Sequence, residues 1–119
     1  MPEQSEFSFD IEAVSQELRV RPEVLKRLII SFSKSMAEKM KNLQLAIEQN
    51  DTTKARVILH ELKGTSGNLR LTEIYKAVDN LHVSIKASEP SDRLTEYLNQ
   101  LTIRFEEFEG YVYSLEKTP

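Results

Sequence analysis

The chain of 119 residues contains no cysteine and has only three glycines and four prolines. Without cysteine it can form no disulfide, use no thiol nucleophile and build no cysteine-ligated zinc site. This lack suits a reducing compartment, and we expect the protein to be cytoplasmic. A sandwich or barrel needs many tight turns, for which this chain has too few turn-forming residues. The composition therefore favours long helices with few connections.

The sequence also lacks an excess of positive charge and any long apolar run. Sixteen Lys and Arg against 19 Asp and Glu give a formal net charge of −3, which argues against nucleic acid as a partner. The first seven residues have neither the basic nor the apolar region of a signal peptide, and no apolar run reaches the length of a membrane span. We therefore expect no membrane association.

Length and composition indicate a single globular domain. A domain typically has about 100 to 200 residues, and 39% apolar with 29% charged residues is ordinary for a chain with one core. There is no repeat, low-complexity segment or interdomain linker. We expect one domain over residues 1–119, with an ordered core at about 7–117, and we expect it to be monomeric.

Apolar residues at spacings of three and four predict helices along most of the chain. A short leading helix is expected behind Asp10, a good N-cap residue. The predicted spans are 10–19, 22 to about 49, 52 to about 68, 72 to a loop at 87–91, and about 92–116. Short connections force antiparallel neighbours. The predicted fold class is therefore all-α, an antiparallel up-down four-helix bundle with a short additional N-terminal helix.

The apolar stripes of the two longest predicted helices identify candidate core residues. In the last helix, Phe105 and Phe108 are expected to pack in the core rather than to form a binding platform. In the helix at 22–49, one face carries a stripe of eight apolar residues: Leu25, Leu28, Ile29, Phe32, Met36, Met40, Leu43 and Ile47.

The predicted helix at 52–68 carries an unusual polar face. At about 100° per residue, five residues fall within one arc on the side away from Leu62: Arg56, His60, Lys63, Gly64 and Gly67. A glycine inside a helix destabilises it by roughly 1 kcal/mol relative to alanine. Two glycines on one exposed face therefore suggest a low surface on which another protein can approach the His60 imidazole closely.

The residues around His60 suit the transfer of a phosphoryl group. A neutral imidazole is a nitrogen nucleophile available near pH 7. Lys63, and more weakly Arg56, would stabilise the negative oxygens of a group bound to it. The sequence has no paired acids, metal-ligand cluster or nucleotide-binding loop near His60. These residues predict a carrier that accepts and donates the group, without cofactor or metal of its own, rather than an enzyme that generates it from ATP.

The segment from His60 to Leu69, His-Glu-Leu-Lys-Gly-Thr-Ser-Gly-Asn-Leu, resembles the signature of histidine-containing phosphotransfer (HPt) domains. The resemblance implies that His60 is the phosphorylated residue, Lys63 the charge partner of the phosphoryl oxygens and Gly64 the residue that keeps access open. It extends more weakly from about Phe7 to Val112 and implies the same four-helix bundle.

Membership in this family would imply a role in a multistep two-component phosphorelay. His60 would take a phosphoryl group from the aspartyl phosphate of one receiver domain and pass it to the aspartate of another, with Mg²⁺ held by the receiver. Arg56, Val57, Gly67 and Arg70 are the candidate docking residues, although Gly67 could instead serve close helix packing or begin the frayed C-terminal end of the helix. The alternative is a helical adaptor that docks a partner through the same face without chemistry.

The sequence departs from the family pattern at two positions. Arg70 stands where family members commonly have a glycine, at the bend into the next helix. Leu81-His82 stands where the family often has Leu-Glu. His82 has no second histidine at i+4, so a metal-binding role for it is disfavoured.

Overall fold

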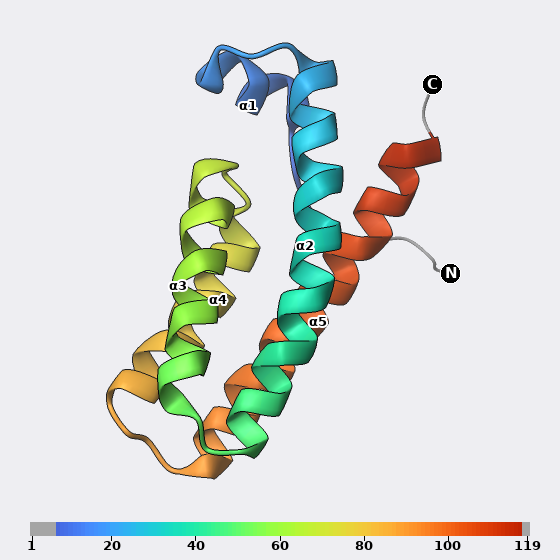
Figure 1. Ribbon diagram of the computed structural model, residues 1–119. Coiled ribbons are helices and arrows are strands. Elements are labelled where there is room, and N and C mark those ends of the chain that lie inside the picture. Colours follow the sequence, from blue (N-terminus) through green and yellow to red (C-terminus); the bar gives the residue numbers. More distant parts are fainter. Residues whose placement is uncertain (1–6, 118–119) are drawn as a thin grey trace.

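The computed structural model describes residues 7–117, which form five α-helices (Figure 1). They are α1 (Ile11–Leu18), α2 (Pro22–Glu48), α3 (Thr52–Asn68), α4 (Thr72–Lys86) and α5 (Ser91–Lys117). Each predicted helix is present, with ends within two residues of the expected ones. The outermost parts of the expected domain, residues 1–6 and 118–119, lie outside the described residues.

The four long helices form a closed antiparallel ring. Helix α2 packs against α3, α3 against α4, α4 against α5, and α5 returns to α2. Helix α1 packs on α2 near the start of that helix (Figure 1). The predicted bundle with a short additional N-terminal helix is thus confirmed. Within residues 7–117, no helix combines the length and the apolarity needed to cross a membrane.

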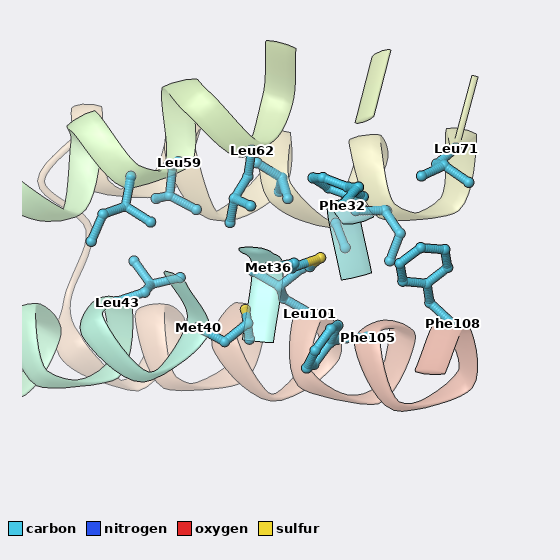
Figure 2. Packing of buried hydrophobic residues seen from close by; sticks show 14 of the residues in the cluster. Phe32, Met36, Met40, Leu43, Leu59, Leu62, Leu71, Leu101, Phe105 and Phe108 are labelled. Carbon is cyan, nitrogen blue, oxygen red and sulfur yellow. The ribbon is translucent and has the colours of Figure 1, made fainter. Parts of the chain in front are cut away.

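The core lies along the axis of the bundle (Figure 2). The predicted core residues Met36, Met40, Phe105 and Phe108 are all buried. Phe7, which precedes α1, packs its ring against Phe108 with centroids 5.3 Å apart and so extends the core. Burial of such side chains contributes about 1.5–3 kcal/mol each to stability, and it fixes which face of each helix remains outside.

One member of the predicted stripe on α2 was wrongly expected to be buried. Leu28 is 46% exposed, whereas Leu25 and Ile29 are fully buried. Leu28 lies at the edge of the buried face, near the start of α2, and its side chain is left partly in solvent.

All four turns between the helices use a residue in the left-handed conformation, and none of these residues is glycine. Arg19, Asn50, Arg70 and Ser88 have φ values of 60°, 57°, 61° and 56°. At the end of α3, Arg70 N donates to Gly67 O at 3.1 Å and Leu71 N donates to Ser66 O at 2.9 Å, the Schellman pattern. A glycine adopts this conformation without strain, which explains why glycine suits the position of Arg70.

We predict that Ser88→Gly stabilises the protein by about 0.5–1 kcal/mol. Glycine relieves the left-handed strain of a residue with a Cβ, and part of that gain is offset by the larger entropy of glycine in the unfolded chain. Urea denaturation of wild type, Ser88→Gly and Ser88→Ala would measure the effect. Alanine keeps the strain, so a glycine variant no more stable than the alanine variant would contradict the prediction.

Candidate functional site

Helix α3 holds His60 on the outside of the bundle. The helix begins after Asp51, whose side chain accepts a hydrogen bond from Lys54 N at 3.0 Å and so caps the first turn. Leu59 and Leu62 are fully buried and anchor the inner face of α3. His60 is exposed, as its position in the helix predicted. The imidazole is therefore accessible on a rigid element.

Two surface depressions meet at His60. The first lies toward the start of α3 and the end of α4, and is lined with His60 by Thr53, Arg56, Val57, Glu61, His82 and Lys86. The second lies toward the end of α3, and is lined with His60 by Lys63, Gly64, Gly67, Asn68 and Tyr75. All five residues predicted on the polar arc thus border one depression or the other.

The two glycines of α3 have different surroundings. A Cβ added at Gly64 would meet no atom within 4 Å, so no packing contact requires glycine there. A Cβ at Gly67 would lie 3.2 Å and 3.3 Å from Cδ2 and Cε2 of Tyr75, which is tight enough to push the ring. Among the alternatives for Gly67, the geometry supports close packing of α3 on α4. Gly64, by contrast, borders open surface beside His60.

Lys63 is held by α4. Its Nζ lies 2.8 Å from Oδ1 of Asp79 and 5.7 Å from the ring centroid of Tyr75. The hydrogen bond to Asp79 raises the pKa of Lys63 further above its usual value, so the side chain is cationic at neutral pH. Sequence reasoning missed Asp79 and Tyr75, because only the packing of α4 on α3 brings them to this face.

The candidate docking residues differ in how free their side chains are. Arg56 is exposed and Val57 is 55% exposed, both on the His60 side of α3. Arg70 instead joins two helices. Its Nε donates to Oε2 of Glu17 in α1 at 2.9 Å, and its Nη1 donates to Gly67 O at 3.0 Å. The guanidinium of Arg70 therefore caps the C-terminal end of α3 and links it to α1.

His82 is buried at 8% exposure on α4. Among residues 7–117, no group of three or more His, Cys, Asp or Glu side chains is arranged to hold a metal ion. Burial lowers the pKa of His82 below its usual value, and the charges of Lys86, Lys63, Arg56 and His60 lower it further. At neutral pH, the His82 imidazole is therefore uncharged in the folded protein.

The lowered pKa of His82 predicts a loss of stability in mild acid. In the unfolded chain its pKa returns to about 6.5, so below that pH the unfolded state binds more protons and the free energy of unfolding falls. The loss develops as the pH falls from about 6.5 toward the pKa in the folded state. Its full size is about 1.4 kcal/mol for each pH unit by which folding lowers the pKa of His82. Urea denaturation at pH 7.5 and 5.5 should show a smaller drop for His82→Gln than for wild type. Equal drops would contradict the assignment.

The fold and the site together define a class of protein. An exposed imidazole, with a lysine one turn further along the same helix of an antiparallel bundle, suits a helical domain that carries a phosphoryl group on histidine. The sequence profile described as the Hpt domain matches residues 27–108, more than half of the chain, and the chain belongs to this family. No curated protein and no solved structure gives a significant match to it.

Family membership establishes the general role of the chain. Hpt domains carry phosphoryl groups on histidine in phosphorelays and interact with receiver domains. The matched segment contains all of α3, with His60 and Lys63, and all of α4, with Asp79 and His82. It omits α1, the first turn of α2 and the last turns of α5.

Proposed function

We propose that His60 accepts a phosphoryl group from the aspartyl phosphate of one receiver domain and passes it to the aspartate of another. The observation that carries this proposal is the exposed His60 imidazole, which has Lys63 three residues later and the open surface of Gly64 four residues later. Residues at these spacings are neighbours on one helix face. The chain acts as a carrier, in the cytoplasm and as a monomer.

The chemistry of the step is a reversible displacement at phosphorus. The lone pair of an imidazole nitrogen forms the N–P bond while the P–O bond to the receiver's carboxylate breaks, and the carboxylate leaves with the electron pair. The cationic Lys63 stabilises charge on the transferred oxygens. We expect the Mg²⁺ that assists the transfer to be bound in the acidic pocket of the receiver.

Docking of the receiver would use the surface around His60. Val57 offers apolar area and Arg56 offers positive charge on the side toward the start of α3. Gly64 leaves the side toward the end of α3 low enough for the receiver's aspartate to reach the imidazole. The α1–α3 link made by Arg70 and Glu17 would hold the neighbouring edge of this surface in place.

The test is transfer from a receiver domain that carries ³²P on its aspartate. We expect the label to move to the chain in the presence of Mg²⁺ and to be labile in acid and stable in base, as an N–P bond is. A second, unlabelled receiver should then remove it. If receivers bind the chain but leave no such label on it, the chain is an adaptor that docks through the same face, and the carrier proposal is wrong.

A further inference from the structure

The cation beside His60 already has an anionic partner on the neighbouring helix. Lys63 Nζ lies 2.8 Å from Oδ1 of Asp79, and both side chains are about one third exposed. The ring of Tyr75, one turn before Asp79 on α4, lies on the same ammonium group with its centroid 5.7 Å away. The ammonium group is thus held toward α4 between a carboxylate and an aromatic face.

Lys63 also borders the surface on which a phosphoryl group on His60 would lie. It is three residues from His60, so the two side chains share one helix face. Both line the depression that contains Gly64 and Tyr75. A single ammonium group therefore has two possible anionic partners: Asp79, and the phosphoryl group once it is present.

We propose that Asp79 is a positioning residue that sets how the phosphoryl group is distributed between His60 and a receiver. By holding the Lys63 ammonium group toward α4, and by adding a negative charge near the phosphoryl dianion, Asp79 keeps phosphohistidine less stable than Lys63 alone would make it. A less stable phosphohistidine is a better donor. This inference rests on the proposed carrier function and adds a residue to it.

The energetic reason lies in the charge of the transferred group. In the step to a receiver, the N–P bond breaks, the nitrogen keeps the electron pair and a P–O bond forms to the aspartate carboxylate. The phosphoryl group on His60 is a dianion, so a cation that is free to pair with it lowers the free energy of phosphohistidine. Where this stabilisation of the bound dianion exceeds that of the transition state, the group leaves His60 more slowly and the equilibrium with the receiver shifts toward phosphohistidine. Engaging that cation in an ion pair has the opposite effect.

The variant that tests this role is Asp79→Asn, which keeps the shape of the side chain and removes its charge. We expect the equilibrium between the chain and a receiver to shift toward phosphohistidine by about 3- to 10-fold at low salt, the size expected for one partly exposed charge. Added salt should reduce the shift. Asp79→Glu, which restores the carboxylate, should return the equilibrium to near the wild-type value.

A second measurement requires no receiver. Potassium phosphoramidate phosphorylates accessible imidazoles directly and releases ammonia, so His60 can be loaded by this small donor. We expect the phosphohistidine of Asp79→Asn to hydrolyse more slowly than that of wild type, by a similar factor. Failure of receivers to label the chain would refute the carrier function, while this hydrolysis rate would still decide the role of Asp79.

Two controls separate positioning from general charge effects. Glu116→Gln removes one negative charge near the end of α5, at the opposite side of the molecule from α3 (Figure 1), and should leave both measurements unchanged. In a Lys63→Met background, Asp79→Asn should have a smaller effect, because only the direct charge contribution remains. The proposal is overturned if Asp79→Asn matches wild type in both measurements, or if Glu116→Gln shifts them equally.

Discussion

Replacement of His60 by glutamine should reduce phosphoryl labelling of the chain to background, a loss of at least about 100-fold. The glutamine amide keeps hydrogen-bonding capacity but has no nucleophilic nitrogen, so no N–P bond can form. The side chain is exposed, and glutamine is a good helix former, so the free energy of unfolding should change by less than about 0.5 kcal/mol. Labelling from a ³²P-phosphorylated receiver, with urea denaturation alongside, measures both quantities.

The chain offers a matched control for this variant, because it has only two histidines. His82 is buried on α4, so His82→Gln should still reach full labelling with acid-labile, base-stable chemistry. Binding of the receiver should survive in His60→Gln, since the docking surface is intact. Persistent label on His60→Gln, or loss of label only from His82→Gln, would show that the acceptor has been wrongly assigned.

Most of the fold could be predicted because its helices are long and amphipathic. Stripes at spacings of three and four located all five helices to within two residues, and the short connections then required antiparallel packing. The turn conformations could not be predicted in the same way. Asparagine is common in the left-handed region, so Asn50 is a natural residue there, but nothing local marks Arg19 or Ser88 for the positive φ that each adopts.

The candidate site, too, could be predicted only in part. His60, Lys63 and Gly64 lie on one helix, so their relative positions follow from helical geometry alone. Asp79 and Tyr75 reach the same surface from α4, and their contacts with Lys63 and Gly67 depend on how α4 packs on α3. The alternatives for Gly67 could be separated only once the position of the Tyr75 ring was known. Sequence spacing thus predicts the residues of one helix face, and packing decides what they contact.

The exposed position of Gly64 leads to the second large effect. Gly64→Gln should slow transfer from a receiver to His60 by about 10- to 100-fold, because a long side chain four residues after His60 covers the imidazole at the point where the receiver's aspartate must arrive. The substitution should leave the fold intact. A Cβ at this position meets nothing within 4 Å, and replacing glycine in a helix interior gains up to about 1 kcal/mol of stability. The transfer rate should therefore fall while the free energy of unfolding rises.

Three comparisons decide whether clearance is the reason for the glycine. Gly64→Ala should gain stability and lose less transfer rate than Gly64→Gln, since a methyl group covers less of the imidazole. Gly110→Gln places the same side chain at an exposed position of α5 and should leave transfer unchanged. Labelling by phosphoramidate, a donor far smaller than a receiver, should fall much less in Gly64→Gln than transfer from the receiver does. Equal losses with both donors would mean that the side chain disturbs His60 itself, and rapid transfer from the receiver would mean that the surface beside Gly64 lies outside the docked interface.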